Sequence, residues 1–370
     1  MRILNVIGRR PTGGIGSVVK NYQKHLDKDV VFDYLLFSDY PEGPFDSEVK
    51  NLGSKVYIVP SLKLKNYIAI NSQLNKLFHN IKNNYDIMHI HTVNVAFLVV
   101  NKAKKIGLNN IIAHSHATKF SDSKLKSLRN NILCKNLKQM TNYYAACSYE
   151  AGEFLFGRNS MINDEVKIIK NAIEIEKYKF SISKRKEFRK ELNFDSDDYL
   201  IGCIGRLSPQ KNLSFALQVF RELVKKNDAK NYKLLIVGEG PELEKLEDLT
   251  NKYKINDKVV FMGFRNDIQD ILSGIDLFFM PSIYEGLPVI GVEALSSGLP
   301  CVFSEAISKE FDSSKSFYIS FKNDIEEWSS NLYSISNFPI DRTEVVTNEL
   351  GYNICEEAKK LKEYYSNIIN

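Results

Sequence analysis

Short apolar runs that end in turns, several of them bearing glycine, and lead into polar helical stretches recur along most of this chain. The first run is RILNVIG, which a glycine-rich turn separates from the helical pattern SVVKNYQKHL. The first half continues with VFDYLLFS, KVYIVP, YDIMHIHT, NIIAHSHA and YYAACS. Strands that alternate with helices in this way predict an α/β fold built on a parallel sheet with crossover helices.

The alternation stops in a charged stretch at residues 171–199, which reads as a linker with some helix, and then restarts. The second series is YLIGCIG, KLLIVGEG, KVVFMGF, DLFFMPS and LPCVFS, with a helix at LSFALQVFRELVKK. Because 370 residues exceed what one core usually supports, we expect two doubly wound, Rossmann-like domains that face each other across a cleft. Their predicted bounds are 1–175 and 176–345, with a helix in 346–370 that crosses back to the first domain.

Composition places the chain among ordinary globular proteins, with 44% apolar and 26% charged residues. The five cysteines are scattered without a C-x-x-C spacing, which argues for a reducing compartment and against a disulfide framework. The first apolar run is too short for a signal peptide, and no stretch approaches the ~20 apolar residues of a membrane-spanning helix. The sequence therefore predicts a cytoplasmic protein.

The net charge of +5 is distributed unevenly along the chain. Residues 1–180 hold 26 Lys and Arg against 15 Asp and Glu, a net of +11, and the remainder holds 24 against 30, a net of −6. A basic first half predicts contact with something anionic, such as nucleic acid, a membrane surface or a phosphorylated substrate.

The first turn reads GRRPTGGIGSVV, with glycines at 13, 14 and 16 before a predicted helix. Glycines let a backbone approach a ligand, and the helix N-terminus favours an anion. A dinucleotide fingerprint would need glycine where Val19 stands, which weakens a nicotinamide-dependent oxidoreductase, although Asp39 after the second strand keeps that function open. A tight turn without a ligand explains this element equally well.

Two cations follow the first strand of the second half. Arg206 and Lys211 lie five residues apart in CIGRLSPQKNLSF, just before a predicted helix. Beside that helix N-terminus they form a pocket suited to a diphosphate, since unit charges about 4 Å apart interact by roughly 4 kcal/mol at an effective dielectric near 20. The alternative is a pair of solvated surface cations.

Two carboxylates accompany an apolar helix in YEGLPVIGVEALSSGLP. Pro288 suits the first turn of this helix and Gly298 suits its end. Glu285 then lies at the helix entrance and Glu293 about a turn and a half inside, so both could face a ligand crevice.

Four of the six histidines form HIH and HSH at the ends of adjacent predicted strands, as His89, His91, His114 and His116. Residues i and i+2 share one face of a strand, so a metal site is conceivable. No cysteine accompanies them and Asp86 alone is a nearby acid. The sequence therefore favours polar groups that line an acceptor pocket without a metal, or core histidines at His89 or His114.

The segment HATKFSDSKLKSLRNNILCKNLKQM is cationic and carries an apolar stripe at helical spacing, Leu125, Leu128, Ile132 and Leu137. Such a stripe is usually the core face of a helix. A basic amphipathic helix can also bind anionic lipid, at roughly 1 kcal/mol per basic residue near the surface.

Read in order, GGIGSVV, HSHA, ACS, IKNAI, GRLSPQKN, LLIVGEGP, FMGFRND and EGLPVIGVEALSSGLPCV strongly resemble the retaining glycosyltransferases of the GT-B fold. The chain is most similar to family 4, and within it to bacterial exopolysaccharide and capsule enzymes. The resemblance spans nearly the whole chain and is most specific in the second half. It implies transfer of a sugar from a nucleoside diphosphate, expected to be UDP, to an acceptor hydroxyl with retention at the anomeric carbon.

The family's roles fall on particular residues here. Arg206 and Lys211 match the cations that hold the donor diphosphate and stabilise it as leaving group, which implies that no metal or other cofactor is needed. Glu293 matches the glutamate that binds the donor ribose. Gly14 matches the glycine turn beside the phosphates, and His116 the histidine near the reacting centre.

Glu285, with the backbone of Gly286 and Leu287, matches the group at the donor sugar's hydroxyls, and Arg265 falls near the nucleobase. Many relatives carry E-G-F-G, whereas Leu287 and Pro288 follow Gly286 here. Proline has no N–H, so the backbone donors that touch the sugar differ from the family pattern.

The implied partners are a nucleotide sugar and a saccharide acceptor that is expected to be lipid-linked, with peripheral contact to the inner face of an anionic membrane and no nucleic acid. The alternatives are a sugar-nucleotide epimerase on the same fold, a nicotinamide-dependent oxidoreductase, and an RNA-binding protein. The oxidoreductase leaves the Arg206, Lys211, Glu285 and Glu293 set without a role, and the chain lacks the clustered aromatics of RNA-binding modules.

Overall fold

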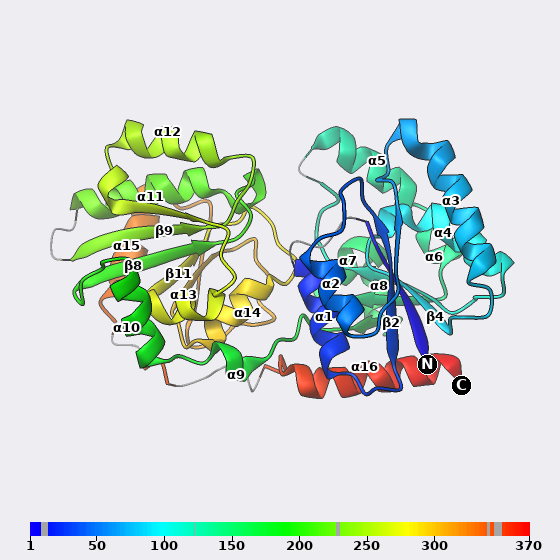
Figure 1. The fold of residues 1–370 in the computed structure, drawn as a ribbon. Helices are drawn as coiled ribbons and strands as arrows, with labels where there is room; N and C mark the ends of the chain where they lie inside the picture. Colours follow the sequence, from blue (N-terminus) through cyan, green and yellow to red (C-terminus); the bar gives the residue numbers. More distant parts are fainter. Residues whose placement is uncertain (9–13, 122, 227–229, 339–340, 344–349) are drawn as a thin grey trace. The chain divides into compact units, whose positions relative to one another are not determined.

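The computed structural model describes residues 1–8, 14–121, 123–226, 230–338, 341–343 and 350–370. The chain divides into two compact units (Figure 1). Unit 1 comprises Met1–Ile173 and Asn353–Asn370, and unit 2 comprises Glu174–Tyr352. The chain thus changes unit close to residue 175, where the sequence predicts a division, and α16 (Ile354–Ile369) lies in unit 1.

Unit 1 contains a seven-stranded parallel sheet of order β3-β2-β1-β4-β5-β6-β7. Its strands are β1 (Arg2–Ile7), β2 (Val31–Phe37), β3 (Val56–Val59), β4 (Ile87–Ile90), β5 (Ile111–Ser115), β6 (Tyr143–Ala146) and β7 (Val166–Ile168). Besides α16, its helices are α1 (Gly14–His25), α2 (Pro44–Asn51), α3 (Tyr67–Asn80), α4 (Ala96–Lys105), α5 (Lys124–Cys134), α6 (Leu137–Met140), α7 (Tyr149–Phe156) and α8 (Arg158–Ile162). The strand order reverses between β1 and β4, which makes their carboxyl ends the topological switch point of the sheet.

Unit 2 repeats this plan with a six-stranded parallel sheet of order β10-β9-β8-β11-β12-β13. Its strands are β8 (Asp198–Ile204), β9 (Asn231–Val237), β10 (Val259–Gly263), β11 (Leu277–Met280), β12 (Cys301–Ser304) and β13 (Ser316–Ile319). Its helices are α9 (Ile175–Tyr178), α10 (Ile182–Glu191), α11 (Leu213–Lys226), α12 (Leu243–Tyr253), α13 (Ile268–Gly274), α14 (Val289–Ser296) and α15 (Ile325–Ser336). Here the switch point lies at the carboxyl ends of β8 and β11.

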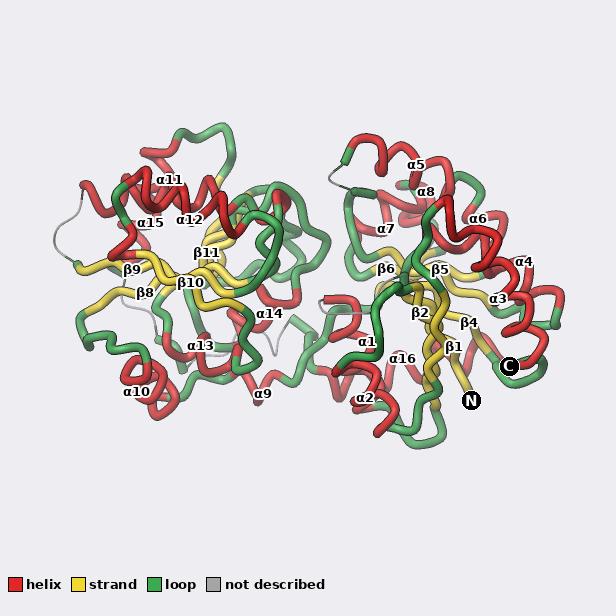
Figure 2. Tube along the Cα trace, turned by 45° about the horizontal axis from the view of Figure 1, so that its top comes forward, coloured by secondary structure: helices red, strands yellow, loops and turns green. Residues whose placement is uncertain are grey.

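The predicted α/β fold with two parallel sheets is confirmed. Helices cover both faces of each sheet, so central strands such as β4, β11 and β12 are buried along their whole length and appear in the sequence as continuous apolar runs. In unit 2, α11, α12 and α15 cover one face, and α9, α10, α13 and α14 cover the other (Figure 2). The stretch 171–199, predicted to be a linker with some helix, forms the helices α9 and α10 and the start of β8.

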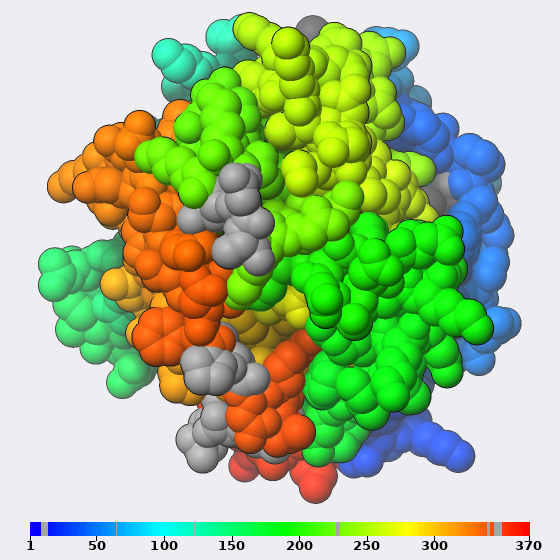
Figure 3. Space-filling model, turned by 90° about the vertical axis from the view of Figure 1, so that its left-hand side faces the viewer, coloured from blue at the N-terminus to red at the C-terminus, as the bar shows by residue number. Residues whose placement is uncertain are grey.

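Unit 2 packs around the single tryptophan of the chain, Trp328 of α15, which is fully buried. Its ring contacts the rings of Phe215, Phe279 and Phe321, and its indole N–H donates to the carbonyl of Ser320 over 3.0 Å. Figure 3 views this unit from the side of α10 (green) and α15 (orange). Because Trp328 lies in unit 2 alone, its fluorescence reports the unfolding of that unit.

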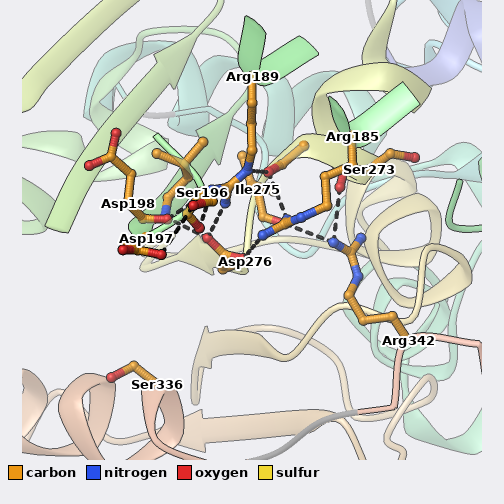
Figure 4. A network of polar contacts seen from close by, with 12 residues as sticks. Arg185, Arg189, Ser196, Asp197, Asp198, Ser273, Ile275, Asp276, Ser336 and Arg342 are labelled. Atoms are coloured by element: carbon orange, nitrogen blue, oxygen red, sulfur yellow. Dashed lines mark hydrogen bonds and ion pairs between the residues drawn. The ribbon is translucent and has the colours of Figure 1, made fainter. Parts of the chain in front are cut away.

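Arg342 joins the C-terminal ends of α13 and α14. Figure 4 shows its side chain near Ser273 and Arg185 at the α13 end. Arg342 donates to the carbonyls of Leu272, Ser273, Ile275 and Ser297 over 2.7 to 3.3 Å. Asp276 accepts from Arg185 and Arg189 over 2.6 Å each. A cation at two helix C-termini satisfies carbonyls that have no partner within their helices.

Burial, with repulsion from Arg185, lowers the pKa of Arg342 to about 9. Gly298, predicted to end the helix, has φ +65°, and a Cβ there would lie 2.3 Å from the Arg342 carbonyl oxygen. The Arg342 contacts therefore fix one end of α14, the helix that carries Glu293.

We expect Arg342→Met to destabilise unit 2 by about 3 kcal/mol, because several buried carbonyls lose their donor at once. Urea unfolding followed by Trp328 fluorescence measures the change. Lys190→Met, which removes an exposed cation of α10, should leave the midpoint unchanged. Equal midpoints for Arg342→Met and the wild type would show that the network does not stabilise the unit.

Candidate active site

The loops after β8 and β11 carry most of the residues singled out in the second half of the sequence. Arg206 follows β8, and Lys211 ends a short 3-10 helix, Pro209–Lys211, just before α11. Glu285, Gly286 and Leu287 lie between β11 and α14. Hydrogen bonds join the two loops, because Ile283 donates from its backbone to the Gln210 carbonyl over 2.9 Å and the Gln210 side chain donates to the Tyr284 carbonyl over 3.1 Å.

The G-E-G turn after β9 supports the Arg206 loop from the other side. The Gly205 amide donates to Val237 and the Leu207 amide to Glu239, each over 2.9 Å. Gly238 has φ +133°, and a Cβ there would lie 2.0 Å from the Gly205 carbonyl oxygen. Glycine is therefore required at this turn by loop packing, and no ligand is needed to explain it.

Lys211 and Glu285 form an ion pair, with Nζ 2.8 Å from Oε1, and their side chains are only 17% and 12% exposed. The sequence predicts separate roles for them, and the structure brings them together. Arg206 is exposed, and no described residue pairs with its guanidinium. One cation at this switch point thus faces solvent while the other is held by a carboxylate.

Glu293 lies on α14, partly buried, as the sequence predicts for a helix flank. Burial raises the pKa of its carboxyl to about 6, against the opposing effects of a hydrogen bond from Tyr178 and the charge of Lys177. Tyr178 ends α9 in the stretch that the sequence predicts to be a linker, so it was missed as a partner of this carboxylate. Its phenol holds the carboxylate in place.

Arg265 lies just after β10 and has two carboxylate partners. Its guanidinium donates to both oxygens of Asp267 over 2.8 and 2.5 Å and lies 3.2 Å from Glu191. The hydrogen bond that Arg265 donates to Asp267 raises the pKa of Arg265 further above its ordinary value. Its predicted place near a nucleobase stays a prediction.

In unit 1, polar side chains gather at the carboxyl ends of β1, β4 and β5. The described part of α1 begins at Gly14, and Gly13 with the rest of residues 9–13 lies outside the described residues. His91 Nε2 lies 3.1 Å from Asn5 Oδ1, and His91 Nδ1 lies 3.0 Å from His116 Nε2. His116 keeps part of its surface accessible, whereas His91 is 6% exposed.

A second pair of histidines lies beside the first and is fully buried. His89 Nδ1 lies 2.7 Å from the Tyr365 hydroxyl of α16, and His89 Nε2 lies 3.0 Å from His114 Nδ1. The rings stack, with centroids 4.2 Å apart for His89 and His91 and 3.9 Å for His114 and His116. The described part of the chain places no carboxylate in hydrogen-bond contact with these four rings.

Burial lowers the pKa of His89 and of His116 to about 3, and holds the pKa of His91 and of His114 well below the usual range. The four imidazoles are therefore neutral at pH 7. Ligand nitrogens of His89, His91 and His114 lie within 4.8 Å of one another, so these three could in principle hold a metal ion. Both ring nitrogens of His89 and of His91 have hydrogen-bond partners, whereas Nε2 of His114 has none among the described residues.

Three of the four residues of the apolar stripe in the basic segment face solvent. Leu125, Leu128 and Ile132 on α5 are 81%, 60% and 65% exposed, whereas Cys134 and Leu137 are buried. The expectation that the whole stripe is a core face is therefore wrong for its first three members. None of the helices in the described ranges is long and apolar enough to cross a membrane.

Residues 184–329 match the family model described as Glycosyl transferases group 1. The chain is 27% identical to the putative glycosyltransferase EpsF of Bacillus subtilis (strain 168), over 99% of this chain and 96% of that protein. It is 26% identical to the UDP-Gal:alpha-D-GlcNAc-diphosphoundecaprenol alpha-1,3-galactosyltransferase of Escherichia coli, over 78% of this chain and 77% of that one. By these matches the protein is a glycosyltransferase, and residues 184–329 carry its group 1 glycosyl transferase domain.

Among solved structures, Anabaena Alr3699/HepE in complex with UDP and glucose superposes with a TM-score of 0.79 at 17% identity, over 99% of both chains. This likeness shows the fold. The two parallel-sheet units are the two Rossmann-like domains of the GT-B fold.

Replacing Glu293 with Gln tests whether its carboxylate opposes folding. Because the folded-state pKa of about 6 lies above the ordinary 4.5, ionisation of Glu293 lowers stability as the pH rises through that window. We expect Glu293→Gln to raise the free energy of unfolding by about 2 kcal/mol at pH 7.5 and to bring no such gain at pH 4.

Urea unfolding followed by Trp328 at both pH values measures this effect. Glu187→Gln, an exposed carboxyl of α10, serves as the matched control and should change stability little at either pH. A gain of the same size at pH 4 and 7.5 would contradict the assignment to ionisation.

Proposed function

We propose that this glycosyltransferase moves a sugar from a nucleoside diphosphate, with UDP as the nucleotide, to a hydroxyl of a lipid-linked saccharide, with retention at the anomeric carbon. The observation that carries the proposal is the convergence of Arg206, Lys211 and Glu285 at the switch point of unit 2, with Glu293 on the adjoining helix. In open parallel sheets ligands bind at that point. The E. coli relative's name supports a UDP-sugar donor and a diphosphate-lipid acceptor.

The diphosphate contacts Arg206, Lys211 and the N-terminus of α11. Exposed Arg206 meets the incoming anion first, since no described carboxylate occupies it. Lys211 then exchanges the Glu285 carboxylate, 2.8 Å away, for a phosphate oxygen. These cations stabilise the charge that develops on the leaving diphosphate, so the mechanism needs no divalent ion.

The exchange at Lys211 leaves the Glu285 carboxylate able to accept hydrogen bonds from the donor sugar. Backbone groups of Gly286 and Leu287 lie beside it, while Pro288 offers no N–H. Glu293, with its carboxylate held by Tyr178, accepts from the two ribose hydroxyls. Arg265, which follows β10, contacts the nucleobase.

The acceptor binds to unit 1, where His116 contacts a hydroxyl at the reacting centre. The leaving phosphate oxygen receives the acceptor proton while the hydroxyl attacks from the same face. We assign the protein to family 4 and to surface polysaccharide assembly. It works at the inner face of the plasma membrane, and the exposed apolar side chains of α5, among lysines, form its contact with anionic lipid.

Arg206→Ala should lower turnover by roughly 100- to 1,000-fold, the scale of losing one preorganised charge-stabilising donor. A donor is first selected by thermal stabilisation with a panel of UDP-sugars, and transfer is then measured with a diphosphate-lipid saccharide. Arg158→Ala, an exposed arginine of unit 1, is the matched control and should keep wild-type turnover. Unchanged activity in Arg206→Ala would contradict the diphosphate assignment, and product without acceptor would indicate an epimerase.

The α5 surface is tested by vesicle flotation at low salt. The wild type should float with vesicles of phosphatidylglycerol and remain below with phosphatidylcholine alone, because binding needs both charge and apolar contact. Leu125→Ser/Leu128→Ser/Ile132→Ser should abolish flotation, whereas Leu52→Ser/Ile162→Ser, at other exposed sites of unit 1, should not. Equal flotation of both variants would exclude α5 as the contact.

A further inference from the structure

A direction for the hydrogen bonds among Asn5, His91 and His116 follows from the contacts of the Asn5 amide. Asn5 lies on β1, and the two histidines follow β4 and β5, so the chain of contacts crosses three neighbouring strands at their carboxyl ends. The Asn5 Nδ2 group faces the Asp33 carbonyl oxygen at 3.5 Å. A carbonyl only accepts hydrogen bonds, so the Asn5 amide nitrogen faces Asp33 and its oxygen faces His91.

The proton positions follow step by step. Asn5 Oδ1 is an acceptor, so His91 Nε2, 3.1 Å away, must carry a hydrogen. His91 is neutral, because burial keeps its pKa well below the usual range, and its Nδ1 is then a bare acceptor. His116 Nε2, 3.0 Å from that atom, must therefore be the donor. A neutral His116 is left with an unprotonated Nδ1.

We propose that Asn5 and His91 are positioning residues that hold His116 as its Nε2–H tautomer, so that its Nδ1 accepts a hydrogen bond from a substrate hydroxyl. His116 keeps accessible surface, as such a contact requires. The proposal rests on the proposed function for the identity of the hydroxyl, whereas the tautomer itself follows from this chain alone.

The neighbouring pair offers a matched comparison. Tyr365 contacts His89, and His89 contacts His114, whose Nε2 is buried with no hydrogen-bond partner among the described residues. The hydrogen bonds that join Tyr365, His89 and His114 end inside the protein, and none of them reaches His116. Tyr365→Phe therefore removes a buried hydroxyl near the hydrogen bonds of Asn5, His91 and His116 without breaking them.

Long-range proton–nitrogen spectra of protein labelled with ¹⁵N-histidine distinguish the two tautomers directly. The chain has six histidines, and His91→Gln and His116→Gln assign the relevant signals. At pH 7.5 we expect His91 and His116 to show a hydrogen on Nε2 and none on Nδ1. Asn5→Leu should release both rings to mixed tautomers, and Tyr365→Phe should leave them unchanged.

Kinetics give the second readout. Asn5→Leu should lower kcat by on the order of 10-fold or more, with the donor KM within a factor of two, because His116 loses orientation rather than donor contacts. A hydrogen on His116 Nδ1 in the wild type, or an Asn5→Leu spectrum identical to wild type, would overturn the proposal. Histidine nitrogen signals that shift when EDTA is added would overturn the proposal and indicate a metal site.

If Asn5→Leu changed the tautomers without changing kcat, only the proposed contact between His116 and substrate would be overturned. The tautomer assignment would stand. The wild-type spectrum decides the tautomer even if Asn5→Leu does not fold. The turnover of Arg206→Ala is independent of all these measurements. Failure of the proposal on the His116 tautomer and failure of the proposed function are therefore distinguishable.

Discussion

The ion pair between Lys211 and Glu285 is the contact on which the rest of the unit 2 site depends. Both side chains are largely removed from water, and each charge compensates the other. The pair joins the loops after β8 and β11, the two strands at which the sheet reverses its order. A ligand with both an anionic and a hydroxyl-bearing part can satisfy both residues at once, which a simple anion cannot.

The polar groups at the switch point of unit 1 are uncharged, in contrast to the ion pair in unit 2. Its histidines are buried and neutral, and they are hydrogen-bonded to one another and to Asn5 and Tyr365. Neutral imidazoles that pair with each other avoid most of the cost of desolvation. The two units therefore share a topology but present different chemistry, cationic and acidic in one and uncharged in the other.

Much of this arrangement could be predicted from sequence, and the exceptions have physical causes. Strands buried on both faces appear as apolar runs, whereas β7 (VKI) and β13 (SFYI) are short, mixed in polarity and were missed. Local spacing placed Arg206 and Lys211 on one loop, but it carries no information on a pair that spans from Lys211 to Glu285. Periodicity likewise identified the apolar stripe of α5 without revealing that nothing in the described part of unit 1 covers Leu125.

The return of α16 to unit 1 sets an order on biogenesis. This helix packs against α1, and its Tyr365 reaches the buried His89, yet it follows all of unit 2 along the chain. During synthesis, unit 2 can complete its core while unit 1 still lacks a covering helix. Part of one face of the sheet in unit 1 therefore stays uncovered until the ribosome has translated unit 2 and then α16.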